Sequence, residues 1–311
     1  MSVIRLGSTW LTSGRRSRES IVNNMSFTWV TTSPTETLAL PTKSGYSYNV
    51  SVDWGDGNSD TFTTWNQTES SHEYATADTY TVTITGDSTF QALDFDRATT
   101  TRTGLREWLS WGDIEWTYLA LAFNTCPNAT FPATDSPDLT NVTDLNSMFN
   151  NCTLANPITT NWITTAVTTF ANMFASCPAA NPDVSLWDVS SATSFNSMFT
   201  ATTLANPDVS SWTTTALLTC ANMFQLAAAA QPDFRDWNVA SLTSANLFLD
   251  QSLSATNATW SAALVNFNAQ SLQNTVAFDA EASTYSGAGA IAARAAIIAD
   301  HSWTIGDGGV V

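Results

Sequence analysis

Basic side chains are scarce in this sequence: its 311 residues hold one lysine, Lys43, and only 10 lysines and arginines together, against 27 aspartates and glutamates. The formal net charge of −17 makes the body of the protein repel nucleic acid and anionic membranes, which excludes both as partners of that body. The charge is also uneven, because residues 1–24 carry +3 and leave −20 for the rest. The arginines of this segment are Arg5, Arg15, Arg16 and Arg18.

Two interpretations of residues 1–24 stay open. The segment is either a basic arm that docks on an acidic surface, including that of a neighbouring copy, or a frayed terminus.

Histidine is also rare, with only His72 and His301 in the chain, which lie in different parts of it. The sequence therefore offers no Ser-His-Asp or Cys-His constellation, and it holds no phosphate-binding loop or dinucleotide fingerprint. We expect a non-enzymatic protein without a cofactor. Because Asp and Glu are abundant, the sequence does not exclude a carboxylate pair for glycoside hydrolysis, so a carbohydrate-active enzyme stays a remote alternative.

The four cysteines lack zinc-site spacing, and we expect them to be reduced packing residues: Cys126, Cys152, Cys177 and Cys220.

Long apolar runs are missing. No stretch approaches the roughly 20 apolar residues of a membrane span. The first residues lack the charged start and the unbroken apolar core of a secretory signal. We therefore expect no membrane insertion and no export through a cleaved signal.

Charged residues make up 12% of the chain, against roughly 25% in ordinary soluble domains. The polar surface must come from Thr, Ser, Asn and Asp, which favour strands, turns and caps over long helices. A hydrophobic content of 43% and 13 tryptophans supply a large core. The composition predicts a β-rich chain, and its length fits two or three domains.

Three columns of residues recur with a step of 25 residues. Because independent columns keep one register, they predict a repeat array over about 104–262, with degenerate copies at both ends. The columns are Met148-Phe149, Met173-Phe174, Met198-Phe199 and Met223-Phe224; Trp162, Trp187, Trp212 and Trp237; and Pro157, Pro182, Pro207 and Pro232.

The unit at 182–206 indicates how each copy folds. Val184–Val189 reads as a short extended stretch, and Ser190 offers a helix N-cap. Phe195, Met198 and Phe199 follow at i, i+3 and i+4, which predicts one face of a short helix. One strand-like and one helix-like segment per unit predict a leucine-rich-repeat-like α/β solenoid.

The 25-residue register places the four cysteines in two columns of the array. Cys220 occupies the column of Leu145, Phe170, Phe195 and Ala245, which predicts a packing residue. Cys126, Cys152 and Cys177 stack in a second column, where side chains in a ladder seldom meet disulfide geometry.

Two polar columns are candidate sites. Asp183, Asp208 and Asp233 stack in successive units, either as weak calcium candidates or as caps of their own turns. The second column consists of amide side chains, for which we favour an internal hydrogen-bonded ladder over a ligand site: Asn156, Asn181, Asn206 and Gln231.

With these motifs in place, the repeats resemble the BspA-like surface-protein repeat family. The units read Trp-x-x-(Ser/Thr)-x-x-x-x-(Phe/Cys)-x-x-Met-Phe, with an Asn-Pro-Asp-(Val/Phe) turn. Residues 105–114 are similar to that family's first segment before the array. An Ala-rich helix at 288–299, followed by Trp303-Thr304-Ile305-Gly306-Asp307-Gly308-Gly309, is similar to its closing segment. The resemblance implies a C-terminal capping segment over 263–311.

A second module precedes the array at 25–87, followed by a linker at 88–103. Val52-Asp53-Trp54-Gly55-Asp56-Gly57, His72-Glu73-Tyr74 and Tyr80–Ile84 resemble the polycystic-kidney-disease (PKD) type of immunoglobulin-like β-sandwich. The resemblance implies that His72 packs or forms hydrogen bonds as a structural mark of that fold. The chain departs from the family at Ala77-Asp78-Thr79-Tyr80, where a Gly usually precedes the Thr-Tyr pair.

Both resemblances imply adhesion and display. Together with the missing export signal, they predict a phage virion structural protein, either a capsid decoration, a head fibre or a tail fibre, located on the virion surface. Its partners would be other virion proteins, held through the N-terminal arm, and a host surface glycan or protein; a homo-oligomer is open. The Thr, Asn and Trp content of the coil faces suits carbohydrate contact. The alternative is a bacterial cell-surface adhesin.

Overall fold

The computed structural model describes residues 24–86, 90–95 and 102–311. The predicted docking arm, with Arg5, Arg15, Arg16 and Arg18, lies outside the described residues. The described chain is β-rich and holds eleven strands and two α-helices, which confirms the β-rich class.

The N-terminal part of the chain folds into two sheets. A five-stranded sheet has the order β4-β3-β6-β1-β7, and β2 pairs with β5 in a second, two-stranded sheet. Alternate residues of β3 and β6 are buried, which places one face of the larger sheet in the core. Tyr74 of β5 stacks on Tyr80 of β6 with ring centroids 4.0 Å apart, so the two sheets pack together. The elements are β1 (Met25–Val30), β2 (Glu36–Ala39), β3 (Ser47–Asp53), β4 (Ser59–Thr64), the 3₁₀ helix η1 (Thr68–Ser70), β5 (Ser71–Tyr74), β6 (Thr79–Gly86) and β7 (Leu105–Ser110).

Strand β7 joins the sheet to the rest of the molecule. It pairs antiparallel with β1, and Glu107 forms a parallel bridge with Thr130 in the next turn of the chain. Trp108 stacks on Phe27 at 5.4 Å between centroids. The segment predicted to open the array is thus also the fifth strand of the N-terminal sheet, and the predicted boundary at 104 separates strands that pair.

The predicted linker at 88–103 also contributes to the core. Phe90, Leu93 and Phe95 are buried, and Leu93 bridges Thr42 of the N-terminal part. The described part of this segment is therefore packed structure.

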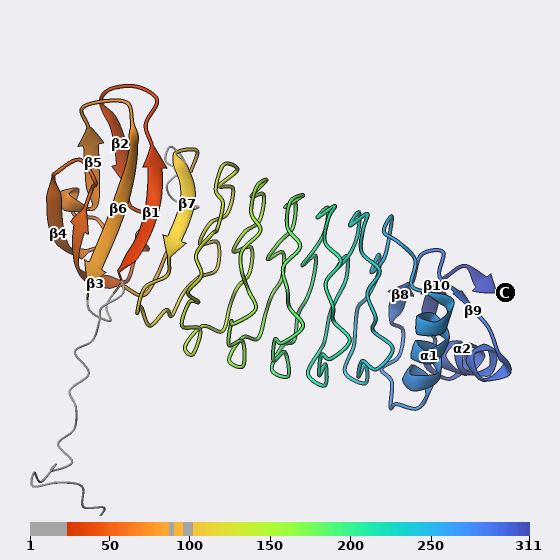
Figure 1. Cartoon of the computed structure of the whole chain (residues 1–311). Helices are drawn as coiled ribbons and strands as arrows, with labels where there is room; N and C mark the ends of the chain where they lie inside the picture. Colours follow the sequence, from red (N-terminus) through yellow and green to blue (C-terminus); the bar gives the residue numbers. More distant parts are fainter. Residues whose placement is uncertain (1–23, 87–89, 96–101) are drawn as a thin grey trace, which may run out of the picture.

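Residues 111–256, called the coil stack from here on, form successive turns that lie side by side between β7 and the C-terminal helices (Figure 1). Single parallel bridges connect neighbouring coils at Asp144, Thr169, Ser194, Thr219 and Ser244, in that order. Consecutive bridge residues are 25 positions apart. The chain therefore returns to the same place after each 25-residue step in this part of the stack.

The helix predicted around Phe195, Met198 and Phe199 is wrong. The segment forms consecutive turns, in which the N–H of Met198 donates to Phe195 O at 3.1 Å. The alternate N–H groups, of Ser197 and Phe199, donate across to the next coil. Ser197 and Ala201 are left-handed, with φ of 54° and 56°. In the interior of an α-helix each backbone N–H donates to a carbonyl of the same helix. The N–H groups of Ser197 and Phe199 donate to the neighbouring coil instead, so this segment cannot be helical.

The C-terminal segment covers the last coil. Ala245 bridges Phe278 of β8, and the aromatic rings of Phe248 and Phe278 lie 5.3 Å apart. The expected Ala-rich helix is α2, and the predicted boundary at 262/263 falls inside α1. No helix of the described residues is long and apolar enough to cross a membrane. The elements are α1 (Asn257–Asn268), β8 (Ala277–Asp279), β9 (Thr284–Tyr285), α2 (Ala288–His301), β10 (Thr304–Gly306) and β11 (Gly309–Val310), with β10 parallel to β8 and β11 parallel to β9.

Candidate functional site

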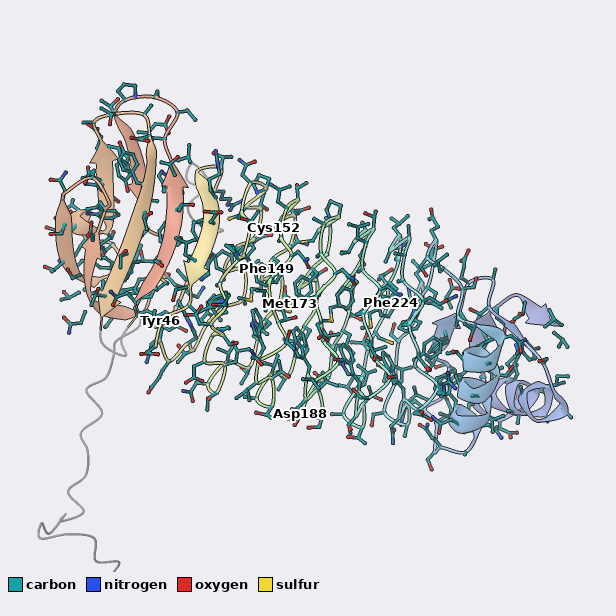
Figure 2. All side chains as sticks on the ribbon, in the orientation of Figure 1. Tyr46, Phe149, Cys152, Met173, Asp188 and Phe224 are labelled. Carbon is teal, nitrogen blue, oxygen red and sulfur yellow. The ribbon has the colours of Figure 1, made fainter. Side chains whose placement is uncertain are left out.

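The Met-Phe columns form the interior of the coil stack. Phe149 and Phe174 stack with centroids 5.4 Å apart and ring planes 7° from parallel, and Phe199 and Phe224 continue the ladder. Figure 2 places Phe149, Met173 and Phe224 within the coils and Asp188 at their margin. All members of the two columns are buried, so they serve packing: Met148, Phe149, Met173, Phe174, Met198, Phe199, Met223 and Phe224.

The Trp column is buried as well. Trp162 stacks on Trp187, and Trp212 stacks on Trp237, each pair at 6.1 Å. The indole N–H groups of Trp187, Trp212 and Trp237 donate to carbonyls of the preceding coil at 3.0–3.2 Å. The expectation that tryptophans on the coil faces contact carbohydrate is therefore wrong, because these rings fill the interior.

The Asp column closes its own turns. Asp183 Oδ1 accepts from the backbone N–H and the hydroxyl of Ser185 at 3.1 and 2.6 Å, and Asp208 repeats this with Ser210. The Ser185 hydrogen bonds hold the pKa of the Asp183 carboxyl below its usual value. Asp233 instead pairs with Arg235 at 2.7 Å. This geometry is that of turn caps. No group of three or more His, Cys, Asp or Glu in the described residues is placed to hold a metal ion.

The amide column forms a ladder on the surface. Asn156 Oδ1 accepts from the N–H of Asn181, Asn181 Oδ1 from Asn206, and Asn206 Oδ1 from Gln231, each at 2.9 Å. The side chains are exposed, and each one ties two coils together.

The cysteines are free and buried. Cys177 Sγ donates to Phe149 O at 2.7 Å, and Cys152 Sγ donates to Phe123 O at 2.9 Å. Thr202 takes the same place in the next coil, and its hydroxyl donates to Phe174 O. Burial raises the pKa of Cys126 and of Cys177 to about 12, so both thiols stay protonated. A shared hydrogen bond, which the cysteine spacing alone did not reveal, explains why Thr202 can follow Cys152 and Cys177 in this column.

His72 is partly buried and packs against core residues of the N-terminal sheets. Its ring stacks on Trp54 at 5.1 Å, and its Nε2 lies 2.7 Å from Asp56 Oδ2. Burial acts to raise the pKa of Asp56, but hydrogen bonds from His72 and Asn58 outweigh it and lower that pKa. His72 thus packs and forms a hydrogen bond. The structure places His301 elsewhere, in the last turn of α2.

Two charged clusters were not predicted from the sequence. Arg294 Nε pairs with Asp307 Oδ2 at 2.8 Å, and the Trp260 indole donates to the same oxygen. The Asp-Gly-Gly motif near the C-terminus therefore anchors the end of the chain to α1 and α2. The second cluster joins Lys43 to Asp94 at 3.3 Å.

Open hollows mark the described surface, and one of them contains a partly exposed tryptophan. This hollow, of about 400 Å³, lies between the end of β2 and the segment from the end of β4 to the start of β5. Its lining includes Leu40, Pro41, Trp65, Asn66 and Gln67. Two further hollows lie beside Trp29 and Arg106 and along the coil at 185–190.

The buried columns, the cross-coil bonds and the capped end define a repeat protein. The family model described as "Mycoplasma protein of unknown function, DUF285" matches residues 117–237, 143–263 and 205–289, which together span 117–289. Because these matches cover more than half of the chain, the protein belongs to this family, which is a BspA-like surface-protein repeat family. No curated protein and no solved structure matches the chain.

Proposed function

We propose that this protein is a non-enzymatic surface-display and attachment protein. Membership of a surface-protein repeat family supports this proposal. The observation that carries it is the use of the repeating side chains: the Trp and Met-Phe columns pack in the interior, and the Asp and Asn columns form hydrogen bonds within and between coils. Repeats of this kind build a support, and they leave recognition to the surfaces at its ends and margins.

The proposed architecture has five parts. A basic docking arm at 1–24 precedes a PKD-like β-sandwich at 25–87 and a linker at 88–103, in which the described residues 90–95 are packed. A leucine-rich-repeat-like solenoid at 104–262 and a C-terminal cap at 263–311 follow. The ladders at 25-residue steps support the solenoid, and the packing of Trp54, His72 and Tyr74 supports the sandwich.

In its specific form, the proposal places the protein on a phage particle as a capsid decoration, head fibre or tail fibre. The arm would dock on acidic virion proteins, since residues 1–24 carry +3 while the remainder carries −20. The modules would project toward a host surface glycan or protein, and many weak copies would add up to firm attachment. The alternative location is a bacterial cell surface, which the surface-protein family favours.

Peptide mass spectrometry across a density gradient of lysate from the source culture tests this proposal. Co-sedimentation with capsid and tail proteins at fixed stoichiometry supports the virion form. Recovery in the envelope fraction, without particles, supports the adhesin and overturns the virion form. Recovery only in the soluble fraction overturns surface attachment altogether.

Removal of residues 1–24 tests the arm separately. The shortened chain should keep its unfolding midpoint, because it retains every core residue that the structure describes, from Met25 onward, and it should lose particle attachment. Unchanged attachment would refute the docking role.

A further inference from the structure

Trp65 differs from the other tryptophans that the structure describes. Eleven of these are buried, whereas Trp65 is only partly buried and packs against the core from its margin. It also lines the hollow of about 400 Å³ beside β2. An indole that is half-buried at the wall of a hollow offers an apolar face to a ligand.

Hydrogen bonds fix the walls of this hollow in place. The Thr42 hydroxyl donates to Trp65 O at 2.8 Å, which ties the residues after β4 to those after β2. Leu40 N–H donates to Ser70 O at 2.9 Å and closes the other side. Gln67 Oε1 accepts from the backbone N–H groups of Thr63 and Thr64. The site is therefore preorganised, which lowers the entropic cost of binding.

The lining combines an apolar floor with neutral polar groups. Leu40 and Pro41 are buried and line the hollow together with Trp65. Gln67 Nε2 and the Asn66 side chain have no hydrogen-bond partner among the described residues, and both face the same hollow. None of the lining residues is charged, in a protein whose net charge is −17. The ligand that suits this surface is neutral, with one apolar face and many hydroxyl groups.

We propose that the hollow at Trp65 is a saccharide-binding site. The indole stacks on the C–H face of a pyranose ring, and the free amide groups of Asn66 and Gln67 bind its hydroxyl groups. This inference rests on the proposed attachment function, and it names the ligand class and its place. Because the hollow is open, a single site binds weakly, with a dissociation constant on the order of 1 mM, and useful strength comes from many copies.

The test uses the full chain labelled with 5-fluorotryptophan and observed by ¹⁹F NMR. Trp65→Phe identifies the Trp65 resonance. Maltohexaose, cellohexaose and chitohexaose are the probes, each titrated to about 10 mM. We expect one of them to shift the Trp65 resonance saturably, while the resonances of the buried tryptophans stay in place.

Two variants separate binding from folding. Trp65→Ala should weaken binding at least about tenfold, and unchanged resonances of the remaining tryptophans verify its fold. Gln67→Glu keeps the acceptor oxygen that holds the loop but removes the Nε2 donor, so it should weaken binding without changing the unfolding midpoint. The proposal is overturned when none of the three saccharides moves the Trp65 resonance, or when Trp65→Ala binds like the parent.

The two proposals fail in distinguishable ways. A negative titration of a protein that still co-sediments with particles or envelope removes the saccharide site alone. A protein found only in the soluble fraction removes the attachment function, whatever the titration shows.

Discussion

The ammonium group of Lys43 lies 3.8 Å from the centroid of the Tyr118 ring, so the chain's one lysine connects the N-terminal sheets to the first coil. The same nitrogen is 3.3 Å from Asp94 Oδ2, and the Asp94 side chain is only 6% exposed. One cation thus bridges three segments that are far apart in sequence.

Replacement of this cation should loosen the junction. Lys43→Met keeps the apolar stem but removes the charge over Tyr118 and beside Asp94. We expect a loss of about 1–2 kcal/mol in the free energy of unfolding, measured by urea titration of tryptophan fluorescence. Lys43→Arg is the matched control, since it keeps a cation of similar reach. Equal stability of Lys43→Met and the parent would contradict the bridge.

High pH should weaken the same junction. Burial acts to lower the pKa of Lys43, but Tyr118 and Asp94 outweigh it and raise that pKa. A raised folded pKa means that the contribution is fully present below the ordinary lysine pKa of about 10.4 and is lost as pH rises through the folded value. The difference in unfolding free energy between the parent and Lys43→Met should therefore shrink above that pH.

Two stacked tryptophans should respond differently to the same change. Trp187 Nε1 donates to Thr159 O at 3.2 Å, whereas the buried Nε1 of Trp162 has no partner among the described residues. Trp187→Phe removes a hydrogen bond, but Trp162→Phe removes an unsatisfied donor. We expect Trp187→Phe to cost about 1–2 kcal/mol more in the free energy of unfolding. Trp212→Phe should behave like Trp187→Phe, and equal costs at 162 and 187 would argue against the assigned bonds.

The surface amide ladder should depend on its acceptor oxygen. Asn181→Ala removes the acceptor for the N–H of Asn206 and should lower the free energy of unfolding by about 0.5–1 kcal/mol. Asn181→Asp retains an acceptor of the same shape and should keep most of that stability in high salt, which screens the added charge. Denaturant titration of both variants checks this. Equal destabilisation by Asp and Ala would contradict the role assigned to the acceptor oxygen.

Replacing a branched residue that has a left-handed backbone conformation should stabilise the protein. Leu226 has φ of 60° and is exposed, and a side chain with a Cβ costs roughly 1–2 kcal/mol in this region. Because Asn tolerates it better, Leu226→Asn should raise the free energy of unfolding by several tenths of a kcal/mol to about 1 kcal/mol. Leu204→Asn is the control, since Leu204 is exposed without a positive φ. The interpretation fails when both variants have the same effect.

The thiols should be inert in the folded protein. Cys126 and Cys177 are fully buried, with pKa values raised to about 12, and alkylation needs the thiolate. Iodoacetamide should modify none of the four cysteines in the native state and all four after unfolding, as intact mass reports. Rapid modification of the native protein would show that the coil interior opens.

The sequence predicted which side chains of a coil face inward, but it did not predict the backbone hydrogen bonds of that coil. The Phe195, Met198 and Phe199 pattern correctly indicates which side chains face inward, but inward spacing of this kind arises from a helix or from consecutive turns. Only the bonds from Ser197 and Phe199 to the neighbouring coil distinguish the two, and these connect residues 24 positions apart.

The pairing of β7 and the exposure of Trp65 depend on contacts between segments that are distant in sequence. The sequence indicated residues 105–114 only as a segment that opens the array, because the pairing of β7 with β1, some 80 residues earlier, leaves no local signal. In the same way, Trp65 resembles every other tryptophan in the sequence. Its partial exposure depends on where the segments after β2 and β4 meet.

Bonds between nearest coils have a mechanical consequence. Each coil of the stack holds its neighbours through a row of backbone hydrogen bonds, and the end of the stack is closed by β8 and the aromatic ring of Phe278. Tension applied along the stack would therefore be borne by one inter-coil row at a time. Each row that yields releases about 25 residues, or roughly 85 Å of extended chain. A protein built this way absorbs a pull by lengthening in steps, and the coils that remain folded keep the two ends of the molecule connected.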